Sequence, residues 1–466
     1  MSIESQNPAT GEVVDTFDET SNEDRERHLE RAIETFEEWR DTPVEHRQQL
    51  LSTAADVLRD GADEYAELMT REMGKPIGQA HDEVEKCAWV CEYYAEHAAE
   101  FLADDVVAGE PNARTLIAYQ PLGPILAIMP WNFPFWQVFR FAAPNLVAGN
   151  VGLLKHASNV PGCAKAIEDI FREAGFPEGA FTALLISSDE IDDVIADDRI
   201  RGVTLTGSDG AGRAVAETAG SELKTSVLEL GGSDPFVVLE DAPMEKTVET
   251  AVQARLINSG QSCIAAKRFI VVDDVYDEFV DRFVEAMDEQ TVGDPIDEDT
   301  DLGPQAREDL MEDLHGQVEE TLEAGGECRL GGEPMDRDGA FYPPTVLTDV
   351  PEDAPADREE LFGPVATVFR VPDEAAAIEK ANDTRFGLGA SVWTEDLARG
   401  ERVARRFESG LAFVNELVKS DPRLPFGGVK DSGYGRELAR DGIREFVNAK
   451  TIWVQHEAGE ETGMVE

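Results

Sequence analysis

A cysteine in a short polar loop is the strongest candidate for chemistry in this chain. Cys263 ends the segment Asn258-Ser259-Gly260-Gln261-Ser262-Cys263, and Glu229 ends an apolar, strand-like run about thirty residues earlier. A thiolate is a strong nucleophile and a nearby carboxylate can act as a general base, so the two residues suit acyl chemistry. Taken by itself, a cysteine such as Cys263 is more often an inert, buried thiol.

Three more segments that could do chemistry follow expected strands. Pro130-Trp131-Asn132-Phe133-Pro134 places a side-chain amide where it can donate to a developing oxyanion. Leu154-Lys155-His156-Ala157-Ser158 offers a lysine and a hydroxyl, which suit a ribose or a phosphate. Thr206-Gly207-Ser208-Asp209-Gly210-Ala211-Gly212 is a glycine-rich turn whose backbone N–H groups could face a pyrophosphate, although it lacks the G-x-G-x-x-G spacing. The plainer alternatives are a hydrophobic turn for the first segment and an exposed loop lysine for the second.

The elements that must position these residues alternate between strand and helix. After helical stripes over residues 21–103, short apolar strands are separated by helices in two successive series, which is typical of parallel, doubly wound sheets. The expected strands of the first series are 124–129, 152–154, 181–186, 202–206 and 226–230. Those of the second are 236–239, 267–272, 366–371, 390–393 and 411–414, with a helix over 244–258 before the Cys263 loop.

Composition and charge narrow the class of protein. A chain of 466 residues is too long for one hydrophobic core, so two or more domains are expected. It carries 41 Lys and Arg against 96 Asp and Glu, a net charge of −55 spread along the whole sequence. That pattern indicates a folded protein with a carboxylate surface that high salt would screen, as in a halophilic source. It argues against nucleic acid or an anionic membrane as a partner.

The cysteines and the apolar runs indicate a cytoplasmic protein. Five cysteines, sparsely placed, do not form a disulfide framework. Cys87 and Cys91 lie four apart on an expected helix with no further ligands nearby to complete a metal site. No run of residues resembles a signal peptide or is long enough to span a bilayer.

The order and spacing of these segments resemble the aldehyde dehydrogenase superfamily. Two further segments belong to the pattern, Glu359-Glu360-Leu361-Phe362-Gly363-Pro364-Val365 and Pro425-Phe426-Gly427-Gly428-Val429-Lys430, and the likeness runs from Asn7 to Trp453. Four stretches are similar to the NAD(P)-dependent succinate-semialdehyde dehydrogenase branch: 130–137, 155–159, 258–268 and 425–437.

The resemblance implies an α/β fold with two Rossmann-like, doubly wound domains and a small β oligomerisation element. The cofactor-binding domain is expected at 1–108 and 122–231, and the catalytic domain at 232–436. The oligomerisation element is expected at 109–121 and 437–466, and it implies a homodimer or homotetramer.

The resemblance also implies roles for single residues. Cys263 would attack the aldehyde, Asn132 and the backbone N–H of Cys263 would hold the oxyanion, and Glu229 would activate the water that hydrolyses the thioester. The cofactor would be NAD or NADP, and no metal is needed. The residues that would bind it are Trp131, Lys155, Ser158, Gly207, Ser208, Leu230, Glu360 and Phe362.

Two departures from the family pattern bear on cofactor and substrate. Ser158 stands where many NAD-preferring relatives carry a glutamate, so NADP should be accepted. Arg140 matches one of two arginines that often bind the distal carboxylate of succinate semialdehyde, but Ile257 stands at the second position. Arg255 or Ser420 could supply another donor, and Arg140 could instead pair with an acidic neighbour.

Other functions remain open at this point. One is a general aliphatic aldehyde dehydrogenase, and another is a CoA-acylating semialdehyde dehydrogenase, whose members generally lack a residue like Glu229. A third is a non-catalytic relative, which would be expected to have lost Cys263, Glu229 or Asn132. All three residues are present.

Overall fold

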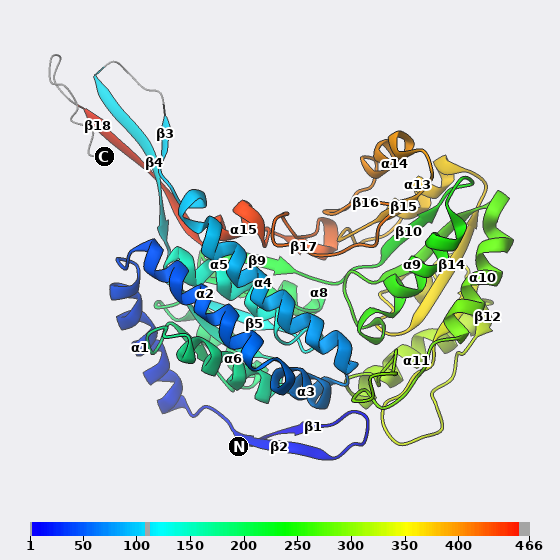
Figure 1. The fold of residues 1–466 in the computed structure, drawn as a ribbon, viewed down its shortest axis with the longest axis horizontal. Coiled ribbons are helices and arrows are strands. Elements are labelled where there is room, and N and C mark those ends of the chain that lie inside the picture. Colours follow the sequence, from blue (N-terminus) through cyan, green and yellow to red (C-terminus); the bar gives the residue numbers. More distant parts are fainter. Residues whose placement is uncertain (1, 108–111, 456–466) are drawn as a thin grey trace.

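A computed structural model describes residues 2–107 and 112–455, and it builds the chain around two large sheets and a projecting β arm (Figure 1). The first sheet has the strand order β17-β9-β8-β5-β6-β7. Its strands are β5 (Pro124–Met129), β6 (Val151–His156), β7 (Phe181–Ala183), β8 (Gly202–Thr206), β9 (Thr225–Glu229) and β17 (Gly433–Tyr434). The strands from β5 to β9 are parallel, and only β17 runs antiparallel to its neighbour.

Helices cover this sheet and bury it. Every residue of β5, β6 and β8 is buried, as expected for parallel strands packed on both faces. The four helices within the sheet's own chain segment are α5 (Trp136–Ala148), α6 (Pro161–Glu173), α7 (Ile191–Ala196) and α8 (Asp209–Ser221). Four more precede it, and α2 and α4 pack against α5: α1 (Asn22–Trp39), α2 (Val44–Asp60), α3 (Ala62–Met73) and α4 (Ile77–Phe101).

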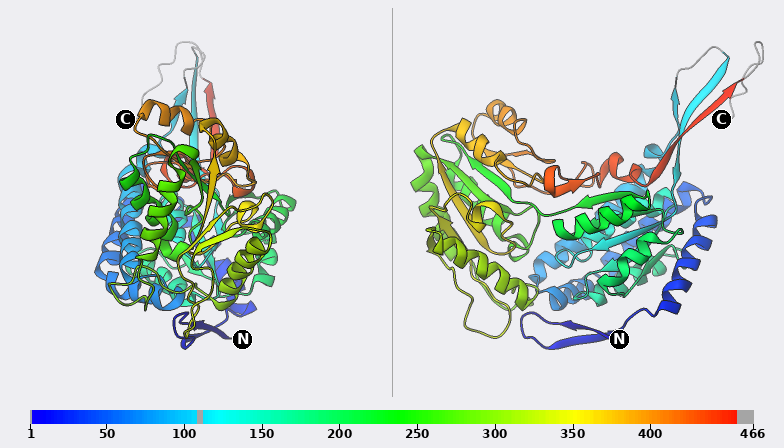
Figure 2. Two further views of the ribbon diagram at one scale, coloured as in Figure 1. Left: turned by 90° about the vertical axis from the view of Figure 1, so that its right-hand side faces the viewer. Right: turned by 180° about the vertical axis from the view of Figure 1, so that it is seen from behind.

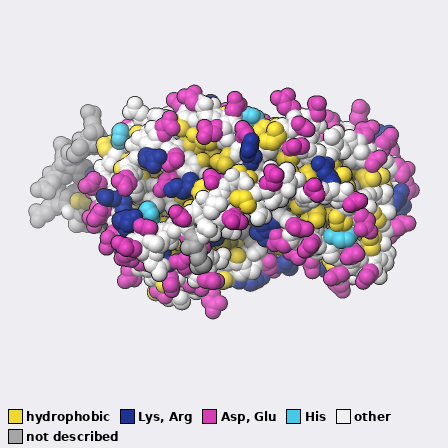
Figure 3. Space-filling model, turned by 90° about the horizontal axis from the view of Figure 1, so that it is seen from below, with side chains coloured by type: hydrophobic (Ala, Val, Ile, Leu, Met, Phe, Trp, Pro, Cys, Tyr) yellow, Lys and Arg dark blue, Asp and Glu magenta, His cyan; other side chains and the backbone are white. Residues whose placement is uncertain are grey.

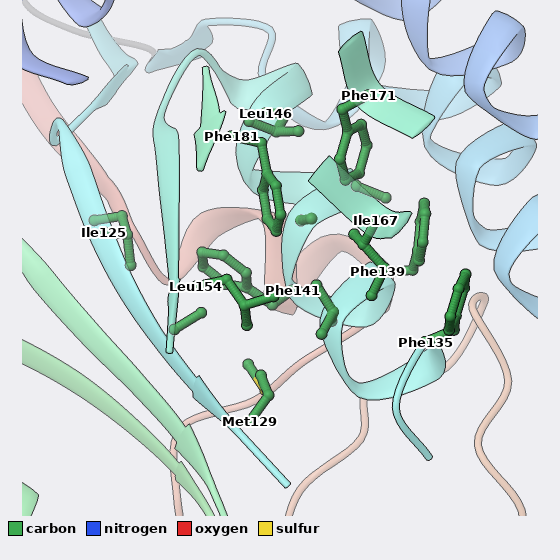
Figure 4. Close-up of a cluster of buried hydrophobic side chains, with 14 of the residues drawn as sticks. Ile125, Met129, Phe135, Phe139, Phe141, Leu146, Leu154, Ile167, Phe171 and Phe181 are labelled. Carbon is green, nitrogen blue, oxygen red and sulfur yellow. The ribbon is translucent and has the colours of Figure 1, made fainter. Parts of the chain in front are cut away.

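An aromatic cluster fixes β5 and β6 against α5 and α6 (Figure 4). Phe139 and Phe141 of α5 and Phe171 of α6 are buried among apolar side chains of the strands. Each such side chain contributes about 1.5–3 kcal/mol through burial. The helix α5 was not expected from the sequence, because all 13 of its residues are buried and no polar face marks its period.

The second sheet has the order β12-β13-β14-β11-β10-β15-β16, and all its strand pairs but β12–β13 are parallel. Its strands are β10 (Asp234–Val238), β11 (Ala266–Val272), β12 (Glu327–Leu330), β13 (Thr345–Thr348), β14 (Val365–Val371), β15 (Ser391–Trp393) and β16 (Phe413–Val414). Its helices are α9 (Met244–Leu256), α10 (Tyr276–Asp288), α11 (Glu308–Glu323), α12 (Pro355–Arg358), α13 (Glu374–Asn382) and α14 (Leu397–Ala404). The prediction of two doubly wound α/β sheets is confirmed.

A three-stranded arm projects from the first sheet's side of the molecule (Figures 1 and 2). It consists of β3 (Asp105–Val107), β4 (Ala113–Pro121) and β18 (Val447–Gln455), and β18 pairs with β4 of the same chain. An N-terminal hairpin, β1 (Ser2–Gln6) with β2 (Val13–Asp18), and the short helix α15 (Ala439–Arg444) complete the described elements.

The chain passes between the two sheets and the arm at positions that differ from the expected domain limits. β17 returns the chain to the first sheet at residue 433, inside the segment 232–436 expected for the catalytic domain. α15 packs against α4 and α5, although 437–466 was expected to belong to the arm. Residues 108–111 and 456–466 of the expected limits lie outside the described residues, and the division itself stays a prediction.

Acidic side chains are scattered over the face shown in Figure 3, with few basic ones between them. The expected carboxylate surface is therefore present on that face. Among the helices of the described residues, none combines the length and apolar character needed to cross a membrane.

Candidate active site

Four strand ends of the first sheet form one edge of the candidate site. Thr206 pairs with Glu229 and Met129 pairs with His156, so the carboxyl ends of β9, β8, β5 and β6 lie side by side. Glu229 is the last residue of β9 and Lys155 lies near the end of β6, and the segments after β8, β5 and β6 carry Gly207–Ser208, Trp131–Asn132 and Ser158. Strand order reverses between β5 and β8, which is where parallel α/β sheets bind ligands.

The amino edge of the second sheet faces this edge. Cys263 precedes β11, and Glu360 and Phe362 precede β14. Three contacts join the two edges: the Trp131 and Phe362 ring centroids are 5.8 Å apart, Gly232 N donates to Glu360 Oε1 at 3.2 Å, and Asn132 Nδ2 donates to Gln261 O at 3.1 Å. The structure thus brings together residues that lie between Trp131 and Phe362 in the sequence.

The loop that presents Cys263 has an unusual backbone. Asn258, Ser259 and Gly260 have φ angles of 54°, 55° and 77°, in the left-handed region. The helix expected over 244–258 therefore ends at Leu256, and that prediction was wrong at its carboxyl end because these residues form a turn.

Arg255 holds the loop in place from beneath. Its fully buried guanidinium donates to the carbonyl oxygens of Gly260 at 2.7 Å, Ala266 at 3.0 Å and Gly363 at 2.6 Å. These bonds flank Cys263 on both sides and tie the loop to the segment before β14. Arg255 is therefore occupied by backbone and is not the additional substrate donor considered from the sequence.

Asn132 is positioned for an oxyanion by a neighbouring amide. Asn258 Nδ2 donates to Asn132 O at 2.7 Å and to Gln261 O at 3.1 Å, which fixes the Asn132 turn to the Cys263 loop. Asn132 Nδ2 gives one hydrogen to Gln261 O, and a side-chain amide has a second hydrogen to donate. That second hydrogen and the backbone N–H of Cys263 are the candidate oxyanion donors.

The Cys263 thiol is protonated at rest. Burial raises the pKa of Cys263 to about 12, although the positive charges of Lys267 and Arg140 act in the opposite direction. Lys267 Nζ donates to the carbonyl oxygens of Ser262 and Cys263, both at 2.8 Å. A thiol with this pKa is a nucleophile only after it has lost its proton.

Glu229 is a buried carboxyl that is free to bind water. Its side chain is 2% exposed, and neither of its oxygens has a hydrogen-bond partner among the described residues. Burial raises the pKa of Glu229 well above its ordinary value, and the nearby carboxyl of Glu437 raises it further. Gly427 lies against it, and a Cβ there would come within 2.7 Å of Glu229 Oε1. A base with a raised pKa is suited to proton transfer near neutral pH.

Arg140 is buried near the carboxyls of Glu229 and Glu437. Its Nε forms an ion pair with Glu437 Oε2, its Nη2 donates to Thr206 Oγ1 at 3.3 Å, and its guanidinium lies 4.5 Å from the Phe426 ring centroid. The side chain is 2% exposed. The acidic neighbour that the sequence left as an alternative is therefore present, and contact between Arg140 and a substrate stays a prediction.

The residues expected to hold the cofactor lie along the two facing edges. Ser208 caps α8 by accepting from Ala211 N at 3.3 Å, and Ser208 and Glu360 line one cavity of about 590 Å³. Glu360 forms a 3.0 Å ion pair with Lys267. Leu230 packs against Gly212, where a Cβ would come within 2.6 Å of it.

Lys155 lies near the end of β6 and Ser158 just after it, at the far end of the same edge. Lys155 is buried and has no ion-pair partner in the part of the chain that the structure describes, and burial lowers the pKa of its ammonium. Ser158 is exposed. An unneutralised lysine beside an exposed hydroxyl is a suitable place for an anionic group of a ligand.

Over residues 2–107 and 112–455, no cluster of His, Cys, Asp or Glu side chains is arranged to hold a metal ion. Cys87 and Cys91 lie on α4 and are both buried, and burial raises the pKa of each thiol.

Comparison with known proteins decides the family. The sequence profile of the aldehyde dehydrogenase family matches residues 1–452. This chain belongs to the aldehyde dehydrogenase family. A Synechocystis protein named as a probable succinate-semialdehyde dehydrogenase (NADP(+)) is 56% identical over 454 residues, covering 97% of this chain and 100% of the relative. The Mycobacterium avium succinate-semialdehyde dehydrogenase (NADP(+)) is 50% identical over 457 residues, covering 97% of both chains.

Solved structures agree with this assignment. The succinic semialdehyde dehydrogenase of Streptococcus pyogenes, crystallised with NADP+, is 40% identical and superposes with a TM-score of 0.95 over 97% of this chain and 100% of its own. A betaine aldehyde dehydrogenase of Staphylococcus aureus is 29% identical, with a TM-score of 0.94 over 97% of this chain and 92% of its own. The aldehyde dehydrogenase fold is therefore shared by enzymes named for different substrates, and the substrate must be argued from the site.

Several residues of this aldehyde dehydrogenase site were missed from the sequence. Asn258, Lys267 and Glu437 all contact or electrostatically influence the three candidate catalytic residues. Asn258 could have been found from the Asn-Ser-Gly turn signal. Lys267 and Glu437 had no local signal, because each reaches the site only through tertiary contacts.

Proposed function

We propose that this chain oxidises succinate semialdehyde to succinate, with NADP or NAD as the electron acceptor and NADP preferred. The observation that carries the proposal is that Asn132 of the first edge bonds to the loop that presents Cys263, while Glu229 ends β9 on the same edge as Asn132. The names of the relatives support the substrate and the preference for NADP.

The first step is attack on the aldehyde. Cys263 releases its proton to solvent and its sulfur bonds to the carbonyl carbon, while the carbonyl oxygen receives hydrogen bonds from Asn132 Nδ2 and Cys263 N. The product is a thiohemiacetal on Cys263. Lys155, Ser208 and Glu360 would hold NADP or NAD, which would supply the hydride acceptor needed to convert this adduct into a thioester.

The second step is hydrolysis. Glu229 accepts a proton from a water molecule, the water oxygen bonds to the thioester carbon, and the carbon–sulfur bond breaks. Glu229 passes this proton to the sulfur, which restores the Cys263 thiol, and the carboxylic acid product releases its own proton to solvent and leaves as a carboxylate. The unpaired oxygens of Glu229 are available for this role.

The residues present fit a dinucleotide with an extra phosphate. Ser208 at the start of α8 and Glu360 share one cavity, so the first can face a phosphate and the second a ribose. Lys155 attracts a 2′-phosphate, and Ser158 does not repel one.

Arg140 is retained in the proposal as a contact for the distal carboxylate. Glu437 and Thr206 engage two of its three nitrogens, which leaves Nη1 for a ligand. The competing reading is that Arg140 only balances the charge of Glu437, which a comparison of charged and uncharged aldehydes in Arg140→Leu separates.

We further propose that the arm joins copies of this chain in a homodimer or homotetramer and that the protein works in the cytoplasm. Trp453 and Val454 of β18 are 55% and 49% exposed, and exposed apolar side chains on an edge strand are suited to pairing with another chain.

The test is a panel of aldehydes, including succinate semialdehyde and butanal, assayed with NADP and with NAD, each with and without CoA. We expect the highest kcat/KM for succinate semialdehyde with NADP, free succinate as the product, and no dependence on CoA. Cys263→Ala should retain less than about 1% of the activity, because loss of the nucleophile costs several kcal/mol of barrier. Formation of an acyl-CoA would contradict the hydrolytic function, and a preference for butanal would contradict the substrate.

A further inference from the structure

A cavity of about 1150 Å³ adjoins the active site between α4 and α9. Its wall includes Phe133, which follows the oxyanion residue Asn132, and Ile257, which precedes Asn258. Both segments that hold the reacting carbonyl therefore contribute to this cavity, and the distal part of an aldehyde substrate can extend into it.

The charge of the cavity is strongly one-sided. Seven acidic side chains line it, and within the described residues Lys86 of α4 is its one lysine or arginine. An aldehyde with a distal carboxylate would be repelled by such a wall unless a cation met it. Lys86 is the cation available for this.

Lys86 makes one hydrogen bond and one contact with an aromatic ring. Its Nζ donates to Ser420 Oγ at 2.7 Å and lies 4.4 Å from the Trp136 ring centroid. A lysine ammonium has three hydrogens to donate, so two remain after the bond to Ser420. Trp136 also lines the cavity, so the ammonium is located at its wall.

The acidic neighbours of Lys86 are bound to other groups. Asp421 pairs with Arg423 at 2.6 Å. Glu83 pairs with Lys75 and accepts from the backbone N–H groups of Phe135 and Trp136, both at 2.9 Å. Lys86 has no carboxylate partner among the described residues, although the chain carries more than twice as many acidic as basic side chains.

A second cation lies near enough to affect Lys86. Burial, followed by the positive charge of Arg140, lowers the pKa of Lys86 to about 8, so the ammonium is still mostly charged at pH 7. A carboxylate close to both side chains would relieve their repulsion and replace water lost by burial.

We infer that Lys86, oriented by Ser420, binds the distal carboxylate of the aldehyde substrate. This inference rests on the proposed function and deepens it, since it supplies the second positively charged contact that Ile257 does not provide.

The experiment compares Lys86→Met, which keeps the length of the side chain and removes its charge, with the unaltered enzyme on succinate semialdehyde and on butanal. We expect the ratio of the two kcat/KM values to fall by roughly 10- to 100-fold, mainly through the KM of succinate semialdehyde. Lys86→Arg should restore part of the ratio because it keeps the charge. Lys165→Met, which removes a surface lysine paired with Glu168, is the matched control and should leave the ratio unchanged.

A binding measurement accompanies the kinetics. Succinate, the product, should raise the melting temperature of the unaltered enzyme, and this shift should be reduced or lost in Lys86→Met and partly restored in Lys86→Arg. A structural role for Lys86 would lower kcat/KM equally for both aldehydes and leave the succinate shift intact, which would overturn the inference.

Failure of the proposed function and failure of the Lys86 inference would give different results. If the unaltered enzyme does not prefer succinate semialdehyde to butanal, the proposed function is wrong, and the inference is overturned with it. If the unaltered enzyme has the preference and Lys86→Met keeps it, only the inference is overturned.

Discussion

The two edges that form the active site are built in different ways. The edge of the first sheet consists of ordinary strand ends in regular register, with Glu229 and Lys155 at the ends of β9 and β6 and Asn132 just after β5. The edge of the second sheet is an irregular loop with three left-handed residues, held by the buried side chains of Arg255 and Lys267.

This difference shows where the geometry of the site is vulnerable. Strand ends are fixed by hydrogen bonds and side-chain packing along their whole length, so single substitutions at the first edge should change chemistry and leave the fold intact. The Cys263 loop depends on a few side-chain bonds to backbone carbonyls, so substitutions beneath it should affect fold and chemistry together.

The largest effect should come from Arg255→Met. It leaves the buried carbonyl oxygens of Gly260, Ala266 and Gly363 without their donor, and we expect a loss of about 3–5 kcal/mol of unfolding free energy together with most of the activity. Urea denaturation measures the loss. Arg405→Met, at an exposed pair with Glu401, is the control and should cost less than about 1 kcal/mol. Similar losses in both variants would mean that the second edge does not depend on Arg255.

The second largest effect is expected at the first edge, in the pH dependence of kcat. Glu437→Gln removes a negative charge that raises the pKa of Glu229, and it also frees the positive charge of Arg140. Both changes favour the ionised form of Glu229. Because Glu229 acts as a base only above its raised pKa, the rising limb of the kcat–pH profile should move to lower pH. The measurement is the kcat–pH profile of the unaltered enzyme and of Glu437→Gln between pH 5 and 10. A shift of the rising limb to higher pH would show that Glu437 does not act on Glu229 through charge.

A smaller effect is expected at the far end of the first edge. Ser158→Glu introduces a carboxylate close to where a 2′-phosphate would lie, so kcat/KM with NADP should fall by about tenfold relative to NAD. Ser158→Gln has the same size without the charge and should change this ratio much less. An unchanged ratio in both variants would mean that Ser158 does not contact the 2′ position.

The smallest effect per residue on stability should come from the charged side chains on the surface. The net charge of −55 produces self-repulsion, which salt screens over about 3 Å at 1 M. The unfolding midpoint should therefore rise between 0.1 M and 2 M KCl. The contribution of the buried Arg140–Glu437 ion pair to stability should change little over the same range of salt. A midpoint that is flat or falls over this range would remove the basis for expecting a halophilic source.

The two edges also differ in how much of their structure could be predicted from the sequence. Motifs at or just after strand ends, at Asn132, Lys155 and Ser208, could be placed because strand ends meet at one sheet edge. The left-handed turn at Asn258 and Ser259 ended the helix two residues before its expected end. Arg140 matched a family position, but its pairing with Glu437 joins residues almost 300 positions apart, and no local pattern reports such a contact. Lys86 gave no signal for the same reason.

The central claim is that Cys263 forms a thioester that only Glu229 hydrolyses efficiently. The most direct test is rapid mixing of Glu229→Gln with succinate semialdehyde and NADP, followed by absorbance of the reduced cofactor. Glu229→Gln keeps the shape of the side chain and removes the base, so we predict a burst of about one equivalent of NADPH per site, then slow turnover and a trapped acyl group on Cys263 in the intact mass. The absence of both the burst and the acyl adduct would contradict the account, because Glu229 would then act before the thioester forms.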